Sequence, residues 1–218
     1  QLDLEAAKQV DVFIANSTET QKRIKKYYGR SSTVIHPPVE ISRFTPARKR
    51  SDHYVTIGRQ LPYKRYDLAV KAATKLNKKL IVFGNGPAHS QLVKLAGPTV
   101  EFRTDRFGDA SDAEYEKAIT TARGFIYPAE EDFGIVSVEA LAAGAPVIGL
   151  ARGGTTDIVT SPDIGTLFHH QTVDDVVKAV EIAEQISFHP SKLARTAKRF
   201  DKGLFLTKIK KVVYDKYH

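Results

Sequence analysis

Short apolar runs alternate with longer amphipathic stretches along almost the whole chain, and this alternation constrains the fold more than any other feature of the sequence. Such runs, bounded by Gly, Pro or polar residues, are typical of buried strands, whereas amphipathic stretches are typical of helices. The predicted strands span residues 10–15, 34–36, 54–57, 80–83, 100–102, 124–127, 146–150 and 166–168. The predicted helices span residues 18–28, 66–76, 88–96, 112–121, 135–143, 173–186, 191–200 and 204–217. This order favours an α/β fold in which a Rossmann-like parallel sheet carries helices on both faces.

Residues 37–50 interrupt the pattern and mark a boundary. The consecutive prolines Pro37 and Pro38 disfavour a helix, and a basic run closes the irregular stretch. Upstream, Ser17 is placed to cap a helix that stops at Gly29. The sequence therefore predicts three parts, which are a short segment over residues 1–36, a linker over 37–50 and the main domain over 51–218.

Composition narrows the classes of function. The absence of cysteine excludes disulfides, thiolate metal ligands and a cysteine nucleophile, and the seven histidines have no spacing typical of a metal site. No apolar run approaches the roughly 18 residues of a membrane span, and the first residues lack the pattern of a signal peptide. The net charge of +8 favours contact with anions, or else describes a solvated basic surface. Because the chain contains no methionine, we expect a processed product or a piece of a longer protein.

The loop after the predicted strand at 54–57 has the residues of a phosphate site. In open parallel sheets, ligands bind at the carboxyl ends of the strands, near the point where the strand order reverses. Gly58 allows a ligand to approach the backbone, and Arg59 and Lys64 supply two cations beside the start of the next helix. Two such cations suit a diphosphate, whereas the alternative interpretation is a pair of solvated surface charges.

A second candidate loop carries acidic residues at the end of a predicted strand. Glu131 precedes a turn at Phe133 and Gly134, and Glu139 lies about two turns along the helix that begins at Ile135. The first N–H groups of that helix can face an anion, and two carboxylates can accept hydrogen bonds from the hydroxyls of a ribose or hexose. An exposed acidic helix start explains the pattern equally well.

Two other loops, at 84–87 and 152–157, contain paired glycines after a strand. Proline in the first turn of a helix and a Gly-Gly turn are common structural devices. We therefore interpret both loops as turns.

Five segments together resemble a known family. Glu131 and Glu139, with seven residues between them, resemble the E-x7-E motif of retaining glycosyltransferases of family 4, which have the GT-B fold. The resembling segments are DVFIANS, VIHPPVEISRFTP, GRQLPYKRYDLAV, GNGP and PAEEDFGIVSVEALAAGAPVIGLARGGTTDIV, and they follow the family's order over about residues 10–200. The resemblance implies that the main domain is the C-terminal, donor-binding half of a GT-B enzyme. It also implies that residues 1–36 are the end of the N-terminal domain and the crossover, packed on the main domain.

The resemblance implies a role for each matched residue. Arg59 and Lys64, beside Gly58, match the pair that binds the donor's diphosphate and stabilises the leaving nucleoside diphosphate. Glu131 matches the carboxylate that contacts the transferred sugar, and Glu139 matches the one that binds the ribose hydroxyls. The remaining donor contacts fall on Phe133, Gly134 and Ile135 at the helix start, and on the nucleobase loop 103–108 with Arg106 and Phe107, which is longer than is usual in the family. Arg59, Lys64 and Glu131 are the expected catalytic residues, with no metal or other cofactor.

The implied enzyme is a retaining hexosyltransferase that uses a nucleotide-diphosphate sugar of the GDP-mannose or UDP-hexose type, as in mannosyltransferases and polysaccharide biosynthesis. Family members hold the acceptor in an N-terminal domain that nothing in this chain replaces, so we expect the isolated chain to transfer poorly or not at all. The alternative is a non-enzymatic nucleotide-sugar-binding module or one half of a split transferase. We expect no nucleic-acid partner, because no RNP, KH or helix-turn-helix signature is present. Charge and resemblance together predict a cytoplasmic protein with peripheral contact to the inner membrane surface.

Overall fold

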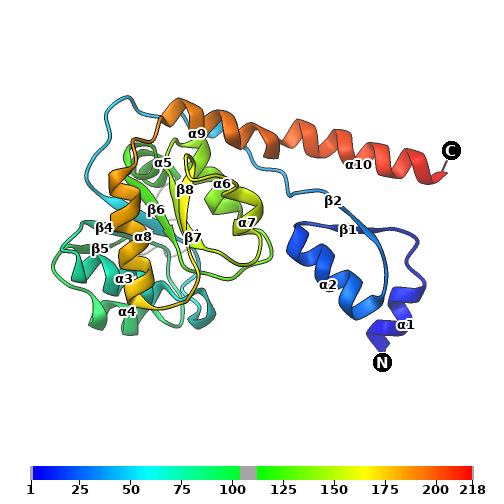
Figure 1. Ribbon diagram of the computed structural model, residues 1–218, viewed down its shortest axis with the longest axis horizontal. Coiled ribbons are helices and arrows are strands. Elements are labelled where there is room, and N and C mark those ends of the chain that lie inside the picture. The colour runs from blue at the N-terminus through cyan, green and yellow to red at the C-terminus, as the bar shows by residue number, and fades with distance from the viewer. Residues whose placement is uncertain (1, 104–111, 218) are drawn as a thin grey trace.

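The main body of the protein is a parallel sheet of six strands with helices on both faces, seen in a computed structural model that describes residues 2–103 and 112–217 (Figure 1). Its strands are β3 (Tyr54–Ile57), β4 (Leu80–Phe83), β5 (Val100–Arg103), β6 (Gly124–Tyr127), β7 (Val147–Leu150) and β8 (Gly165–Phe168). Its helices are α3 (Tyr66–Lys75), α4 (His89–Leu95), α5 (Asp112–Thr121), α6 (Ile135–Ala142), α7 (Thr155–Ile158), α8 (Val173–Gln185), α9 (Pro190–Ala197) and α10 (Lys202–Tyr217), with the 3-10 helices η1 (Ile41–Arg43), η2 (Pro62–Lys64) and η3 (Lys198–Phe200). The expected α/β fold is confirmed.

Two hydrophobic cores hold the sheet between its helices. Along β6, Phe125 and Tyr127 pack into the core that includes α5, α6 and α9, whereas Ile126 packs into the core of α3, α4 and α8. Successive side chains of a strand point to opposite faces, so a strand covered on both faces must be apolar at every position. The continuous apolar runs of the sequence are the consequence of this double burial.

The strand order reverses between β3 and β6. The order is β5-β4-β3-β6-β7-β8, so the chain moves outward from β3 to β5 and then returns to pair β6 with the other side of β3. Tyr54 pairs with Gly124 and Val55 with Phe125 in parallel register. The loops after Ile57 and Tyr127 therefore lie side by side at the carboxyl ends of the strands, which is where open α/β sheets bind ligands.

Residues before the main body form a second, smaller unit that lies beside it (Figure 1). Its elements are α1 (Leu2–Lys8), β1 (Phe13–Ala15), α2 (Thr18–Tyr28) and β2 (Ser32–Val34), and its two strands pair in parallel. As predicted, the Ser17 side chain caps α2 at its start, accepting a hydrogen bond from the Thr20 N–H, and Gly29 ends it in a left-handed conformation with φ of 66°. The helix α1 was not predicted.

The strand predicted at 34–36 lies two residues earlier, at 32–34. Ile35 still donates a backbone hydrogen bond to Ala15, but His36 leaves the sheet. Its ring stacks on Phe133 at 5.4 Å and meets Phe200 edge to face at 5.2 Å. Aromatic packing against the main body, which a local pattern does not reveal, thus ends the strand early.

The stretch 37–50 has only the short helix η1 as regular structure, yet it is packed against the main body. Val39 and Phe44 are buried in the core. The Arg50 guanidinium donates hydrogen bonds to carbonyls of Thr120 and Ala143, at the ends of α5 and α6. Burial lowers the pKa of Arg50 to about 10. The basic run is therefore partly structural, because one of its cations satisfies carbonyl groups at two helix ends.

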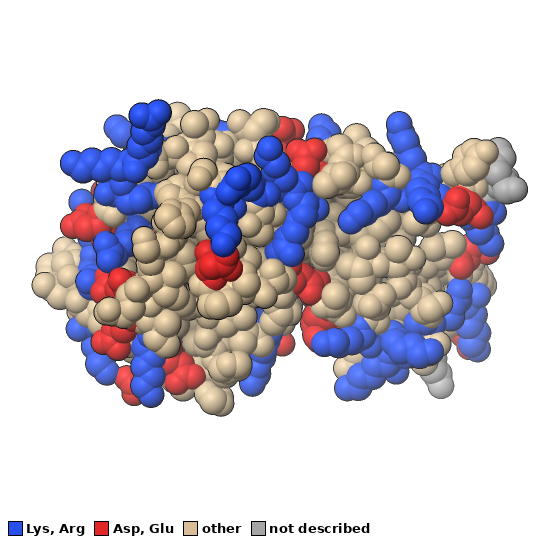
Figure 2. Space-filling view, turned by 45° about the horizontal axis from the view of Figure 1, so that its top comes forward, with Lys and Arg blue, Asp and Glu red and all other residues tan. Residues whose placement is uncertain are grey.

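The surface of the protein carries its basic residues broadly. Figure 2 shows Lys and Arg side chains spread over the visible face rather than gathered in one patch. Within residues 2–103 and 112–217, no helix combines the length and apolar content that crossing a bilayer requires.

Asp157 on α7 ties the N-terminal unit to the main body. Its carboxylate accepts hydrogen bonds from the Thr18 N–H at 2.7 Å and from the Thr18 hydroxyl, and it lies 3.1 Å from His36 Nε2. A second tie is the ion pair between Arg23 on α2 and Asp132. The first contact reaches the helix that follows β7, and the second reaches the loop that follows β6.

Replacement of Asp157 by alanine is expected to loosen the N-terminal unit. Hydrogen bonds to a charged group contribute about 1.5–3 kcal/mol each, so losing this cluster should raise local opening at α2 by at least about tenfold. The measurement is amide hydrogen exchange, with faster exchange expected in β1, α2 and β2 and no change in β3 to β8. Asp163→Ala is the control, because Asp163 pairs with Lys192 within the main body. Equal exchange of α2 in wild type and Asp157→Ala would show that other contacts hold the unit.

Candidate functional site

The two cations predicted in the loop after β3, Lys64 and Arg59, lie in different environments. Lys64, at the end of η2, turns back over Gly58, whose φ is 144°. A Cβ atom at Gly58 would collide with the Tyr66 hydroxyl and lie 3.5 Å from Lys64 Nζ, so this position has room only for glycine. Arg59 is exposed at the rim of the loop. One cation is thus held within the site, and the other faces solvent beside it.

The acidic loop after β6 meets Lys64 directly. Lys64 Nζ lies 2.8 Å from Glu131 Oε1, and both side chains are mostly buried, with exposed fractions of 16% and 22%. The other oxygen of Glu131, Oε2, accepts a hydrogen bond from the Tyr127 hydroxyl. The reversal of strand order thus brings together two residues that lie far apart in the sequence.

The start of α6 forms the floor beside this pair. Gly134 precedes the helix with φ of 92°, a left-handed conformation that favours glycine, and an added Cβ would lie 3.0 Å from the Tyr127 ring. Phe133 is buried, whereas Ile135 is exposed. Glu139, on the same helix, accepts a hydrogen bond from Tyr115 on α5 at 3.0 Å. The first predicted carboxylate therefore contacts η2, and the second contacts α5.

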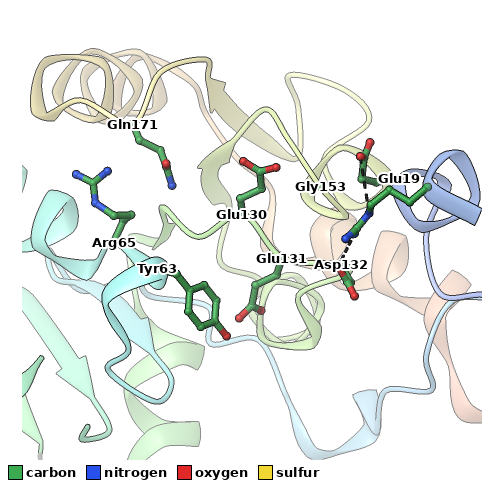
Figure 3. Close-up of a pocket in the computed structure, with 9 residues that line it drawn as sticks. Glu19, Tyr63, Arg65, Glu130, Glu131, Asp132, Gly153 and Gln171 are labelled. Atoms are coloured by element: carbon green, nitrogen blue, oxygen red, sulfur yellow. Dashed lines mark hydrogen bonds and ion pairs between the residues drawn. The ribbon is translucent and has the colours of Figure 1, made fainter. Parts of the chain in front are cut away.

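A cavity of about 400 Å³ opens between the N-terminal unit and these loops. Its size falls within the roughly 300–1,000 Å³ of small-molecule sites. Figure 3 shows the Glu131 carboxylate directed toward Tyr63 and Asp132 directed toward α2. The lining residues are Glu19, Arg23, Tyr63, Arg65, Glu130, Glu131, Asp132, Gly153 and Gln171.

The glycine loop after β7 supports the acidic loop. The Gly154 N–H donates to the Glu131 carbonyl at 2.9 Å, and a Cβ at Gly154 would overlap the backbone of Phe133. The loop after β4 supports the loop after β3 in the same way, since a Cβ at Gly86 would lie 2.7 Å from the Gln60 carbonyl oxygen. The first loop turns at Pro87 and Ala88, and the second turns at Gly153 and Gly154 before α7 begins. Both also hold the backbone of a candidate site loop in place.

Several residues of the site were not predicted from the sequence. Gln60 is fully buried and bonds the Gly84 carbonyl through Nε2 at 2.6 Å and His89 Nδ1 through Oε1 at 2.8 Å. Tyr127 ends the apolar run of β6, whereas Tyr115 lies between Glu114 and Glu116 in α5, and in neither case does the sequence show which group the hydroxyl meets. Burial, followed by the nearby charge of Glu131, raises the pKa of Tyr127, so its hydroxyl stays a protonated donor.

Two of the predicted donor contacts, Arg106 and Phe107, lie outside the described residues. Among the described residues, no group of three or more His, Asp or Glu side chains is placed to hold a metal ion.

A parallel α/β sheet with a basic loop and an acidic loop facing each other where its strand order reverses defines a Rossmann-like ligand-binding domain. The sequence profile of the family described as "Glycosyl transferases group 1" matches residues 39–200. This match covers most of the chain, and the protein belongs to that family.

Relatives of known function match the chain over part of their length. It is 28% identical over 195 residues to the D-inositol 3-phosphate glycosyltransferases of Mycobacterium bovis and Mycobacterium tuberculosis. The match covers 79% of this chain and 41% of each relative, so the chain spans about two-fifths of the length of these proteins.

Solved structures of GT-B glycosyltransferases share the fold. A sucrose-phosphate synthase from Thermosynechococcus elongatus superposes with a TM-score of 0.80 at 19% identity, over 99% of this chain and 61% of that one. Anabaena HepE in complex with UDP and glucose gives 0.80 at 19% identity, over 98% and 67%. The pneumococcal O-GlcNAc transferase GtfA in complex with UDP and GlcNAc gives 0.77 at 19% identity, over 100% and 47%. The expected Rossmann-like domain of the GT-B fold is thus confirmed.

Proposed function

We propose that this chain is the donor-binding part of a glycosyltransferase and that it holds a nucleotide-diphosphate sugar at the carboxyl ends of β3 and β6. The observation that carries the proposal is the pair of Lys64 and Glu131, 2.8 Å apart. A cation suited to a phosphate and a carboxylate suited to sugar hydroxyls come from different loops and meet at the crevice.

Each part of the donor has a matching group. Lys64 and the exposed Arg59 bind the diphosphate, and Glu131 accepts hydrogen bonds from the transferred sugar. Glu139 binds the ribose hydroxyls, and the backbone N–H groups at the start of α6 face the sugar and phosphate.

Departure of the diphosphate from the anomeric carbon is the difficult step. Negative charge grows on the leaving oxygen while the sugar becomes oxocarbenium-like, so cations already in place lower the barrier. Lys64 is in place before the donor arrives, since Glu131 holds its ammonium group. The resemblance to family 4 favours retention at the anomeric carbon without a metal.

The donor base has two candidates. HepE and GtfA hold UDP in their structures, which makes a UDP-hexose the first donor to test. GDP-mannose remains the second, because a diphosphate clamp and a ribose carboxylate suit either nucleotide. With GDP-mannose the enzyme would be a mannosyltransferase, and polysaccharide biosynthesis is the setting that the resemblance favours for either donor.

The acceptor is expected on a partner domain. Two-stranded sheets are marginally stable alone, and here Val10, Val12 and Ile14 of the N-terminal unit are each 39% exposed. An acceptor-binding domain that covers these exposed apolar side chains would supply the missing part of the site. Without such a domain the chain would be a nucleotide-sugar-binding module or half of a split transferase. The charge of +8 supports a cytoplasmic protein that acts at the anionic inner surface of a membrane.

The proposal is tested by calorimetric titration of the chain, without metal, with UDP, GDP, ADP and their hexose conjugates. Micromolar binding of one series is expected. Glu139→Ala should weaken that series at least about tenfold, since it removes charge-assisted hydrogen bonds to the ribose. Glu181→Ala, an exposed change on α8, is the matched control. No binding of any series to the folded chain, alone or in its full-length protein, would contradict the proposal.

A further inference from the structure

Each of the two candidate carboxylates is bonded to a buried tyrosine whose hydroxyl the proposed donor contacts do not use. The side chain of Tyr127 is fully buried, and that of Tyr115 is 7% exposed. The Tyr127 hydroxyl donates to Glu131 Oε2, and the Tyr115 hydroxyl donates to Glu139 Oε2 at 3.0 Å.

We propose that Tyr127 and Tyr115 are positioning residues that fix the two carboxylates separately, Tyr127 for the sugar half of the donor and Tyr115 for the nucleoside half. The inference rests on the proposed function, because it assigns each tyrosine to the carboxylate through which it would act.

The ring of Tyr127 is fixed by its packing, so its hydroxyl oxygen lies in one place, beside Glu131. The ring stacks on Phe125 at 5.8 Å between centroids and lies beneath Gly134, where a Cβ would be 3.0 Å away. Were Glu131 to turn away, the buried hydroxyl would lose its partner, and an unpaired buried polar group is costly. The hydrogen bond therefore favours one conformation of the Glu131 side chain.

The hydroxyl of Tyr127 also has a distinct task beside Lys64. Lys64 bonds Oε1 of Glu131, while Tyr127 bonds Oε2. When the ammonium group of Lys64 also donates to a bound diphosphate, the neutral phenol shares in holding the carboxylate. It carries no charge, so it leaves the negative charge of Glu131 available to the sugar hydroxyls.

Tyr115 serves the second carboxylate from a different element. Its ring lies edge to face against Phe83 at 5.6 Å and Phe44 at 6.2 Å, which fixes the first turn of α5 on the sheet. Because the Tyr115 hydroxyl bonds Glu139, the position of the Glu139 side chain on α6 depends on α5. Because Tyr127 ends β6 and Tyr115 belongs to α5, loss of one hydroxyl should leave the other carboxylate in place.

The experiment compares three conservative variants, Tyr127→Phe, Tyr115→Phe and the control Tyr54→Phe. Tyr54 is also buried and donates a hydrogen bond to a carboxylate, that of Glu184, at 3.0 Å. It begins β3, so it lies at the amino ends of the strands, away from the site. Each variant is titrated with UDP and UDP-glucose, and with GDP and GDP-mannose, and thermal unfolding checks that it is folded.

Tyr127→Phe should weaken binding of the sugar conjugate about tenfold and change binding of the free diphosphate less than about twofold. Tyr115→Phe should weaken both ligands by the same factor, about tenfold. Tyr54→Phe should change neither. In a Glu131→Gln background, Tyr127→Phe should add no further loss for the sugar conjugate, since the two act through one contact.

Equal weakening of both ligands by Tyr127→Phe, or no effect of it, would overturn the role of Tyr127. An unchanged affinity for the free diphosphate in Tyr115→Phe would overturn that of Tyr115. If Tyr127→Phe fails to fold, the Glu131→Gln variant decides alone. If this variant still binds the sugar conjugate more tightly than the free diphosphate by the wild-type factor, Glu131 does not contact the sugar. Tyr127 would then have no carboxylate to position for it. Failure of the wild-type chain to bind any of the four ligands is a different result, which refutes the proposed function itself.

Discussion

Replacement of Lys64 by alanine is expected to weaken binding of a nucleotide-diphosphate sugar by about 10- to 100-fold, the worth of a charge-assisted hydrogen bond of about 1.5–3 kcal/mol. The change removes the cation above Gly58 and also leaves the Glu131 carboxylate without its ion-pair partner. A carboxylate near a diphosphate repels it, so both consequences act in the same direction. Calorimetric titration of variant and wild type measures the loss.

Lys75→Ala is the matched control for this prediction. Lys75 forms an exposed ion pair with Asp174 on the surface between α3 and α8, and exposed pairs contribute little. It removes the same net charge without touching the crevice. Equal losses in the two variants would mean that net charge alone attracts the nucleotide. Unchanged affinity in Lys64→Ala would remove Lys64 from the diphosphate contacts.

Replacement of Gly154 by alanine is expected to lower the free energy of unfolding by about 1–3 kcal/mol, the usual cost of forcing a methyl group into a filled space. The new Cβ would overlap the backbone of Phe133, which cannot rotate away as a side chain can. Gly154 has φ of −68° and ψ of −14°, which suit alanine, so the effect comes from the collision rather than from backbone strain. Urea denaturation gives the free energy, and donor titration shows whether the acidic loop has moved.

Gly203→Ala provides the comparison for Gly154→Ala. Gly203 lies in the first turn of α10, and its added Cβ would approach only a side-chain oxygen of Asp201, at 3.1 Å. Alanine is favoured over glycine in helices by about 1 kcal/mol, so this variant should be as stable as wild type or more so. A Gly154→Ala protein with wild-type stability and wild-type donor affinity would show that the glycine loop does not support the site.

The strands and helices of the main body could be predicted because each is encoded locally. Double burial gives β4 and β6 continuous apolar runs, and the limits predicted for both strands were correct. The early end of β2 could not be predicted in this way, since it depends on contacts such as the stacking of His36 on Phe133.

For the candidate site, the sequence indicated the residues but not their arrangement. Lys64 and Glu131 were singled out separately, and their contact follows only from the strand order that sets β3 beside β6. Tyr127 and Tyr115 could not be found, because neither the apolar run that ends at Tyr127 nor the charged helix around Tyr115 shows which group a tyrosine hydroxyl meets. The loop at Gly153 and Gly154 likewise shows only a turn in the sequence, because its contacts are with the distant residues Glu131 and Phe133.

The most direct test of donor binding at the carboxyl ends of β3 and β6 is amide hydrogen exchange of the chain with and without saturating nucleotide-diphosphate sugar. Slower exchange is expected in residues 58–64 and 131–139, with the strands themselves unchanged. Protection confined to another surface, such as the cavity lined by Leu61, Ala88 and Leu92 between η2 and α4, would contradict this placement of the donor.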